Sequence, residues 1–414
     1  MQTFSIVFVT ALGLATAIKL WLGMRHLGHV LRHRDAVPAE FTQDISLDAH
    51  QHAANYSREK TRLDLVTTVL EAAVILTLTF GGGLQWLHEI TAGMLAPGVM
   101  RGVALIVLLG VLTTALELPF GWYRTFNIEQ RFGFNKMTPR MFVADTAKNA
   151  GIAAALGIPL VACILWVTER AGPLWWLYAW LIWVVFNLLI LMVYPTWIAP
   201  LFNKFVPLDD PQLKERIENL LARCGFRAQG LMVMDGSRRS NHGNAYFTGF
   251  GKTKRIVFFD TLLARLAPGE VEAVLAHELG HFKLRHVFKR VAWIFTASLG
   301  FLWLLAQLMD QQWFYAGLNV QAPSTAMALI LFLTVMPQFL FLLHPVTSYY
   351  SRKHEFEADH YAAQNASVAD LITALVKLYK DNASTLTPDP LHSVFYDSHP
   401  PAALRIARLK RYPA

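Results

Sequence analysis

Two histidines four residues apart, with a glutamate directly after the first, stand in the segment VLAHELGHFKLRH, residues 274–286. On a helix, residues four apart share a face, so His277 and His281 can point both imidazole rings at one ion. Glu278 lies one position further around the helix and can reach a water molecule bound to that ion. Two histidine ligands and a glutamate base are the arrangement found in zinc peptidases. The alternative interpretation is a helix with a polar stripe that faces solvent.

A catalytic zinc ion takes three protein ligands and keeps one open position, so a third ligand must come from elsewhere in the chain. The segment SRKHEFEADHYAAQ, residues 351–364, offers two carboxylates four apart on one helix face, Glu355 and Asp359. We predict that Glu355 binds the ion. We predict that Asp359 accepts a hydrogen bond from a ligand histidine, which fixes the tautomer of that ring.

Three further polar residues near these motifs receive a different interpretation. His286 comes five residues after His281 and, on a continuing helix, would point away from the ligand face. His354 and Glu357 face another side of their helix than Glu355 does, so we expect them on its solvated surface. His360 stays ambiguous.

The segment that precedes the zinc motif has the pattern of a small domain outside the bilayer. Asp210 and Pro211 predict the start of a helix, and Gly225 predicts its end. GLMVMDG, NAYFTGF and KRIVFFD follow, and each predicts a short strand. Pro268 then opens PGEVEAVLAHELGHFKLRH, whose apolar period and first-turn proline predict a helix. The motif is therefore expected on a helix that follows a small sheet.

The composition of the whole chain is that of a membrane protein. Of 414 residues, 54% are hydrophobic and 16% are charged, whereas soluble domains carry about 25% charged residues. Apolar stretches of about 20 residues predict transmembrane helices. We predict seven spans, near residues 3–24, 64–87, 99–121, 149–168, 173–197, 290–311 and 325–349.

These spans divide the chain and set the predicted fold class. We expect a mainly α, polytopic membrane protein with seven transmembrane helices and a small α+β, zincin-like catalytic domain. The predicted order is five spans with their loops, the catalytic segment, spans six and seven, and a helical segment that supplies the third metal ligand. Their ranges are 1–202, 203–289, 290–350 and 351–414.

Basic residues alternate between the two predicted sides of the membrane. The segments 25–63, 122–148 and 198–289 are rich in Lys and Arg, whereas 312–324 has none. The positive-inside bias then predicts a cytoplasmic catalytic domain and C-terminus, with the N-terminus outside. This topology accounts for the net charge of +8, so no nucleic-acid partner is expected. Glu71 and Glu117 fall in spans, where acidic side chains usually face a wet cavity.

Six strings in one order resemble the type I CAAX prenyl proteases, the seven-span zinc metallopeptidases of the a-factor-converting family. The smaller HtpX-like membrane proteases share the later motifs but have fewer spans and lack the first string. The resemblance covers almost the whole chain. The strings are LPFGWYRTFNIEQRFGFNKMT (118–138), PTWIAPLFNKFVPL (195–208), SNHGNAYFTGFG (240–251), HELGH (277–281), SRKHEFEAD (351–359) and DSHPPAALRIARL (397–409).

The resemblance implies a fold and a metal centre. Members of the family enclose a water-filled chamber within a ring of seven helices, closed by the catalytic domain. His277, His281 and Glu355 would hold one Zn²⁺, with Glu278 as the catalytic base and Asp359 behind a ligand histidine.

The resemblance also implies how substrate is bound and cut. An edge strand would pair with the substrate backbone, and its residues would be Asn244, Ala245, Tyr246 and Phe247. His399, in the SHPP sequence, would lie near the zinc and act in catalysis by donating to the oxyanion. Arg405 would be a structural or substrate-positioning partner, and the residues alone leave open that it is a plain helix-surface arginine.

Two other classes of protein compete with this interpretation. In an intramembrane peptidase of the site-2 type, the zinc motif would lie inside an apolar span, whereas Lys283, Arg285, Lys289 and Arg290 surround it here. A seven-span receptor or transporter with an incidental motif would bind no zinc.

The substrate and the source are predicted from the resemblance and the loops. Family members remove the last three residues after a prenylated cysteine, so a peptide or protein substrate, prenylated or membrane-embedded, is expected beside the lipid bilayer. Short loops and the absence of a dilysine signal in RLKRYPA are typical of a bacterial inner-membrane protein. Turnover of misfolded membrane proteins, without a prenyl requirement, is then the alternative function.

Overall fold

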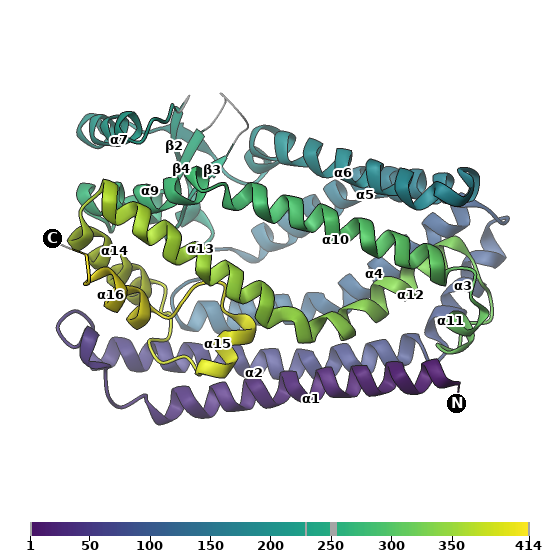
Figure 1. The fold of residues 1–414 in the computed structure, drawn as a ribbon. Coiled ribbons are helices and arrows are strands. Elements are labelled where there is room, and N and C mark those ends of the chain that lie inside the picture. The colour runs from purple at the N-terminus through teal and green to yellow at the C-terminus, as the bar shows by residue number, and fades with distance from the viewer. Residues whose placement is uncertain (1, 228–229, 249–254, 413–414) are drawn as a thin grey trace.

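The computed structural model describes residues 2–227, 230–248 and 255–412. Long helices run side by side along the molecule, and a smaller α+β part lies at one end of them (Figure 1). The N-terminus lies at the opposite end of the bundle from this part, and the C-terminus lies beside it. The predicted fold class, a mainly α membrane protein with a small α+β catalytic part, is confirmed.

Six helical segments of the described residues are long and apolar enough to cross a membrane, and a bent pair makes a seventh. The bent pair corrects one prediction, because the expected span at 64–87 is not one continuous helix. α2 (Leu47–Leu78) and α3 (Gly83–Met94) meet at an angle of 55°. The break falls in the FGGGL stretch, where Gly82 has a φ of +78°, a conformation that glycine adopts at little cost.

The other membrane helices follow the predicted apolar stretches; several are longer than predicted, whereas those at 175–193 and 325–340 are shorter, and the last candidate span, Thr325–Asn365, comprises two helices. Prolines enter several of them without ending the helix, as is common in membrane spans. Their bounds are Thr3–Arg32 for α1, Val99–Tyr123 for α4, Pro139–Arg170 for α5, Trp175–Val193 for α6, His286–Leu308 for α10, Thr325–Leu340 for α12 and His344–Asn365 for α13; the short α11, Gln312–Ala316, joins α10 to α12.

A four-stranded sheet forms the centre of the α+β part, in the order β1-β2-β4-β3. β2 and β4 are parallel, and both edge strands run antiparallel to their neighbours. The three predicted strands are present, and β1, which contains a proline at its end, was not predicted. The strands are Phe205–Pro207 (β1), Gly230–Met234 (β2), Ala245–Thr248 (β3) and Arg255–Phe259 (β4).

Helices cover this sheet and close its apolar core. The predicted helix α7 (Pro211–Arg223) begins where the Asp210 side chain accepts hydrogen bonds from two backbone N–H groups. Gly225 follows its end with a φ of +71°. Apolar residues of α7, β4 and α9 pack together with those of α14. The remaining helices are α8 (Asp260–Leu263), α9 (Pro268–Lys283), α14 (Val368–Asp381), α15 (Pro390–Tyr396) and α16 (Ala402–Leu409).

The zinc motif and the second motif lie on the neighbouring helices α9 and α13. Gly280 of α9 faces Ala358 of α13, and a Cβ atom on Gly280 would lie 3.0 Å from the Ala358 Cα and 3.1 Å from its carbonyl oxygen. Both neighbours are backbone atoms, so they cannot move aside as a flexible side chain would. The glycine therefore lets the two helices approach closely between the motif residues.

Candidate metal centre

Three side chains from α9 and α13 bring one donor atom each to a common point. The Nε2 atoms of His277 and His281 lie 3.2 Å apart. Glu355 Oε1 lies 3.2 Å from the His281 Nε2, and Glu355 Oε2 lies 3.5 Å from the His277 Nε2. Donors at 2.0–2.1 Å from a tetrahedral zinc ion stand about 3.3 to 3.4 Å from one another. The separation of the two imidazole nitrogens and that of His281 Nε2 from Glu355 Oε1 match edges of such a tetrahedron, and the second oxygen of the same carboxylate faces His277.

The surroundings of Glu355 fit a bound cation. Its side chain is buried, and Oε2 has no hydrogen-bond partner among the described residues. A buried carboxylate oxygen without a partner is costly, because the charge has lost its hydration. A cation between the two imidazole rings and this carboxylate would supply the missing interaction. The donor set, two imidazoles and one carboxylate, is that of catalytic zinc sites with an open position.

An ion-paired cluster lies behind His277. The His277 Nδ1 lies 2.9 Å from Asp359 Oδ1, so its N–H donates to this carboxylate and Nε2 keeps its lone pair for the metal side. Arg405 of α16 donates to Asp359 through Nη2, at 2.6 Å, and through Nε, at 2.9 Å. All three side chains are buried. Arg405 is therefore not a plain helix-surface arginine.

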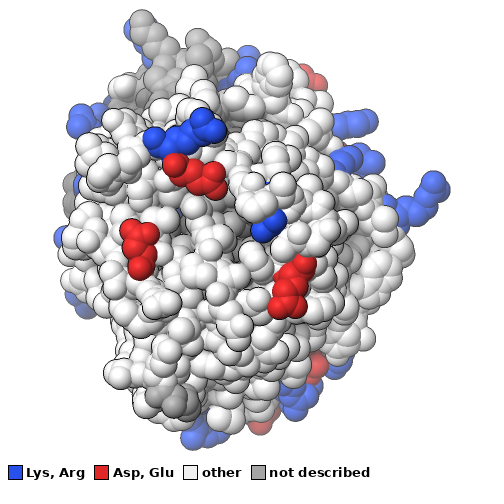
Figure 2. Space-filling view, turned by 90° about the vertical axis from the view of Figure 1, so that its right-hand side faces the viewer, with Lys and Arg blue, Asp and Glu red and all other residues white. Residues whose placement is uncertain are grey.

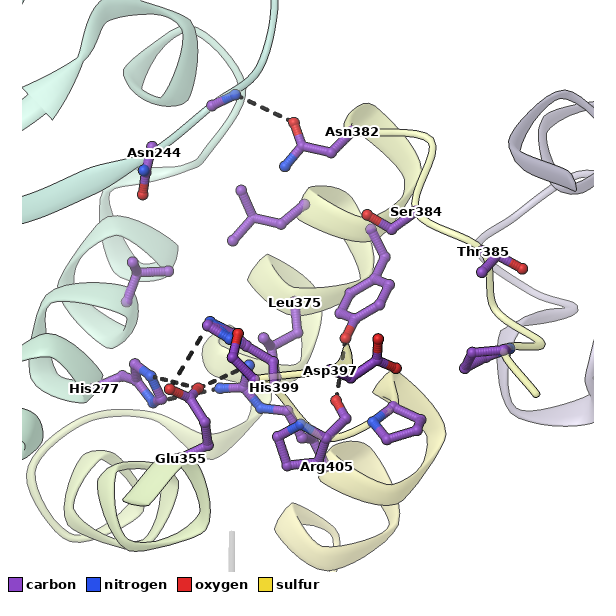
Figure 3. A pocket seen from close by; sticks show the side chains of 18 of the residues that line it. Asn244, His277, Glu355, Leu375, Asn382, Ser384, Thr385, Asp397, His399 and Arg405 are labelled. Atoms are coloured by element: carbon purple, nitrogen blue, oxygen red, sulfur yellow. Dashed lines mark hydrogen bonds and ion pairs between the residues drawn. The ribbon is translucent and has the colours of Figure 1, made fainter. Parts of the chain in front are cut away.

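Glu278 and His399 lie at the rim of the same centre. Both line a cavity of about 600 Å³ that also exposes the metal-site residues His277 and Glu355. Burial raises the pKa of the Glu278 carboxyl above its ordinary value, so this group takes up a proton more readily than an exposed glutamate. The His399 Nε2 lies 3.9 Å from Glu355 Oε1, and in Figure 3 His399 and Glu355 meet at one side of the pocket.

The predicted edge strand forms another wall of this cavity. β3 stands at an edge of the sheet, and Asn244 and Ala245 line the cavity. Asn244 immediately precedes the strand, and its carbonyl oxygen accepts a hydrogen bond from the backbone N–H of Phe259 in β4. Because hydrogen bonding alternates along an antiparallel strand, the backbone groups of Ala245 and Phe247 point to the outer edge. Asn244 approaches the pocket from the strand side (Figure 3).

Models of two protein families together match almost the whole chain. The model described as CAAX prenyl protease N-terminal, five membrane helices, matches residues 26–204, and that of peptidase family M48 matches residues 207–412. The CAAX prenyl protease 1 homolog of Arabidopsis thaliana is 36% identical over 389 residues, which cover 89% of each chain. The chain belongs to peptidase family M48.

Other relatives of this M48 peptidase extend the likeness across eukaryotes and to a solved structure. CAAX prenyl protease 1 of Saccharomyces cerevisiae is 31% identical, over 90% of this chain and 88% of the yeast protein. The human CAAX prenyl protease 1 homolog is 30% identical, with the same coverage. The crystal structure of S. mikatae Ste24p superposes with a TM-score of 0.92 at 28% identity and covers 99% of both chains.

These comparisons decide between the classes that the sequence left open. The resemblance to the CAAX prenyl proteases is confirmed, and the chain is a multi-pass membrane metallopeptidase. The receptor or transporter interpretation is therefore wrong. The motif helix α9 lies in the α+β part and is not among the candidate spans, as it would be in a peptidase of the site-2 type.

A second cavity of this M48 peptidase adjoins the first and is lined in part by α1 and α2 of the helix bundle. It has a volume of about 840 Å³, and it shares Asn382, Tyr396 and Asp397 with the cavity at the metal centre. Lys19 and Glu71, on α1 and α2, line it and lie 3.9 Å apart. Glu71 thus faces a cavity, in line with the chamber of the Ste24p-like fold, whereas Glu117 is not among the residues that line this cavity.

The M48 peptidase also contains functional neighbours that the sequence did not identify. The Tyr379 hydroxyl, on α14, donates to the carbonyl oxygen of Pro400 at 3.3 Å, directly after His399. Arg352 donates through Nη1 to the carbonyl oxygens of Ser393 and Asp397 at 2.9 and 3.0 Å. These bonds fix the segment that presents His399. Arg352 lies within the SRKHEFEAD string, which was its only signal, and Tyr379 had none.

His286 is not part of the group of three candidate metal ligands described above, as predicted, but its expected orientation is wrong. The predicted solvated surface at His354 and Glu357 is present only in part, because both side chains are half-buried. His286 is completely buried, and its Nδ1 lies 3.0 Å from the His281 Nδ1. Its Nε2 lies 2.9 Å from Glu357 Oε2, so the partly exposed Glu357 side chain is bonded to a buried histidine. The His354 ring stacks on that of His286. The cause is a break between α9 and α10, which the sequence prediction treated as one continuing helix.

Proposed function

We propose that the chain is a zinc endopeptidase in which His277, His281 and Glu355 hold a single Zn²⁺. The observation that carries this proposal is the approach of two imidazole Nε2 atoms, 3.2 Å apart, to the two oxygens of the Glu355 carboxylate, at 3.2 and 3.5 Å. The buried Oε2 of Glu355 supports it, because this oxygen accepts no hydrogen bond from the described residues and has only longer contacts, to His277 Nε2 at 3.5 Å and to Arg405 Nη1 at 3.7 Å. Asp359 holds the His277 ring from behind through the bond at Nδ1.

The metal ion and the residues beside it would each have a separate role in amide hydrolysis. A zinc ion held by His277, His281 and Glu355 would lower the pKa of a water molecule and would polarise the scissile carbonyl group. Glu278 takes the proton from the attacking water and then delivers it to the leaving amine. His399 donates a hydrogen bond to the oxygen on which negative charge develops.

The substrate backbone is proposed to lie along β3. The outward backbone groups of Ala245 and Phe247 would pair with it as one more strand, next to Asn244 and Tyr246. Part of the lining of this cavity is apolar, which suits aliphatic side chains beside the scissile bond. This apolar part includes Val274, Leu371, Leu375 and Leu378.

We propose further that the substrate carries a prenylated cysteine and loses its last three residues. The relatives named CAAX prenyl protease 1 support this, because they match along nearly the full chain. The position of the two cavities supports it too, since the cavity at the metal centre adjoins one lined by the membrane helices α1 and α2.

The catalytic part is proposed to face the cytoplasm of a bacterial inner membrane. The end of the molecule with α3 and α11 shows few charged side chains, and most of its surface is uncharged (Figure 2). Basic residues are frequent in the segments next to the catalytic part, such as 122–148. The positive-inside bias then sets the catalytic end inside. Labelling of single cysteines at both ends of α1 in intact cells tests this orientation.

Replacement of Glu278 tests the proposed mechanism. Glu278→Gln keeps the shape of the side chain but cannot accept the proton, so peptidase activity should fall about 10³-fold or more. Its zinc content should equal that of the wild type, because Glu278 is not one of the three proposed ligands. Elemental analysis and cleavage of a quenched peptide measure the two quantities. A Glu278→Gln protein with wild-type activity would contradict the proposal.

A pair of peptides with the same sequence tests the prenyl requirement. One peptide carries a farnesylated cysteine four residues from its end, and the other carries an unmodified cysteine. We expect the farnesylated peptide to be cleaved with the higher kcat/KM and to lose three residues. Equal cleavage of both peptides would instead favour turnover of misfolded membrane proteins without a prenyl requirement.

A further inference from the structure

A second group of polar side chains adjoins the metal centre on the side of His281. His286 lies at the start of α10, and His354 and Glu357 lie on α13. Nitrogen and oxygen atoms of these three residues lie within 4.8 Å of one another. They do not take part in the peptidase mechanism described above. The group could be a second metal site, or it could act on the first one.

The orientation of the rings argues against a second metal site. The His286 and His354 rings are stacked, with centroids 4.0 Å apart and planes only 11° from parallel. The lone pair of an imidazole nitrogen lies in the plane of its ring, and a zinc ion binds along it at about 2.0–2.1 Å. Lone pairs in two nearly parallel planes 4 Å apart do not converge on one ion.

The hydrogen bonds connect the group to His281 instead. If Nε2 of His281 faces the metal, its proton must be on Nδ1. That N–H then donates across the 3.0 Å contact to Nδ1 of His286. His286 in turn carries its proton on Nε2 and donates to Glu357 Oε2 at 2.9 Å. In this series of hydrogen bonds, from His281 through His286 to Glu357, each atom is either a donor or an acceptor. The assignments do not conflict with one another at any step.

The backbone shows how a residue five positions after His281 returns to it. On a continuing helix, His286 would stand about 140° around the axis from His281. α9 ends at Lys283 and α10 begins at His286, and Arg285 between them has a φ of +58°. This left-handed conformation is unfavourable for a residue with a side chain. The turn directs the His286 ring back to His281, where it is completely buried.

We propose that His286 and Glu357 are positioning residues that fix the ring orientation and the tautomer of His281. This inference rests on the proposed function, because it assigns His281 as a metal ligand. His286 and Glu357 would act on the His281 side as Asp359 does on the His277 side. The stacked His354 ring keeps the His286 ring in its plane. Neither His286 nor Glu357 touches the substrate.

Two variants of nearly equal shape separate the hydrogen bond from packing. Asn and Leu have similar outlines, and the Oδ1 of Asn can take the place of Nδ1 of His286. In His286→Leu, we expect zinc affinity, measured by competition with a chelator, to fall about 10- to 100-fold. In His286→Asn, the affinity should stay within a few-fold of the wild type. The visible spectrum of the Co²⁺-substituted protein should change in the Leu variant and remain like wild type in the Asn variant.

A substitution of Glu357, which is half-buried, serves as a test that does not depend on correct folding of the His286 variants. Glu357→Leu should also weaken zinc binding, but by a smaller factor. It removes only the last acceptor in the series of hydrogen bonds and leaves the bond between His281 and His286 in place. The inference would be overturned if both His286 variants, or none of the three, changed the affinity. It would also be overturned if the wild type bound two metal ions per chain and His354→Leu bound one.

The wild type and a ligand variant distinguish failure of this inference from failure of the proposed function. If the wild type binds one zinc ion and His281→Leu loses it, the metal centre stands. Unchanged zinc affinity in His286→Leu would then refute the positioning role alone. If His281→Leu binds zinc as tightly as the wild type, the proposed function and the inference both fail.

Discussion

The two imidazole rings of the metal centre are supported in different ways. His277 is backed by Asp359 and Arg405, and all three side chains are at least 90% buried. His281 is backed by His286 and Glu357, and the Glu357 side chain is 35% exposed. Beyond Glu357 lies Lys353, at 3.9 Å and 55% exposed. One chain of hydrogen bonds thus ends in a buried ion pair, and the other ends at the surface.

This difference predicts different energetic roles for the two sides. A buried carboxylate and guanidinium depend on each other, because loss of either leaves an unpaired charge without water. A surface pair contributes about 1 kcal/mol or less, since solvent replaces the lost partner. The His277 side should therefore support both folding and metal binding. The His281 side should support metal binding with little effect on folding.

Replacement of Arg405 should have the largest effect on stability. Arg405→Leu leaves the Asp359 carboxylate buried and unpaired, and the free energy of unfolding should fall by about 3–5 kcal/mol. Arg405→Lys restores the charge but not the two parallel bonds, so it should recover part of the loss. Thermal unfolding of the metal-free protein in detergent measures both variants.

The matched control is Lys353, the basic residue on the His281 side of the centre. Lys353→Leu removes the partner of Glu357, and the free energy of unfolding should change by no more than about 1 kcal/mol. An equal loss of stability in Lys353→Leu and Arg405→Leu would break the contrast between the two sides.

A methyl group at Gly280 should affect both sides together. In Gly280→Ala the new Cβ meets backbone atoms of Ala358 at 3.0 and 3.1 Å, so α9 and α13 must separate. Overpacking of this kind costs about 1–3 kcal/mol. The separation also moves Glu355 away from both histidines, so zinc affinity should fall even where the protein remains folded. Unfolding and chelator competition test this, and an unchanged zinc affinity would show that the helices approach closely for packing alone.

The sequence predicts the motif residues of the site better than it predicts the tertiary contacts that these residues make. His277, Glu278 and His281 follow from one helical period, and Glu355 with Asp359 from another, because such spacing is local. Tertiary contacts are different. The contact of Arg405 with Asp359 joins positions 46 residues apart, and nothing in the period of α16 indicates it.

The error at His286 has a local cause that the sequence conceals. Helices usually end at glycine or before proline, yet α9 ends before Leu284 and Arg285. The left-handed residue here is an arginine rather than a glycine. Because no glycine or proline marks the end of α9, the sequence prediction extends its apolar period through His286. A continuing helix would place His286 on a different face from His281. The bent span at α2 and α3 was easier to anticipate, since three glycines stand at its break.

Two isosteric amides should resolve the smallest predicted difference between the sides. Asp359 Oδ1 accepts from His277 Nδ1 and from Arg405 Nη2, and Oδ2 accepts from Arg405 Nε. In Asp359→Asn, the new NH₂ group faces an N–H donor in either orientation, so zinc affinity should fall about 10- to 100-fold.

In Glu357→Gln, by contrast, the amide oxygen can still accept from His286 Nε2, and the lost charge is partly screened by solvent. Its zinc affinity should therefore fall only a few-fold, clearly less than that of Asp359→Asn in the same chelator competition. A loss in Glu357→Gln as large as in Asp359→Asn would mean that the negative charge at Glu357, and not only its acceptor oxygen, sustains the His281 ring. Glu357, at the exposed end of its series of hydrogen bonds, would then contribute as much to zinc affinity as the buried Asp359. The two sides would differ in their effect on folding stability but not in their effect on zinc binding.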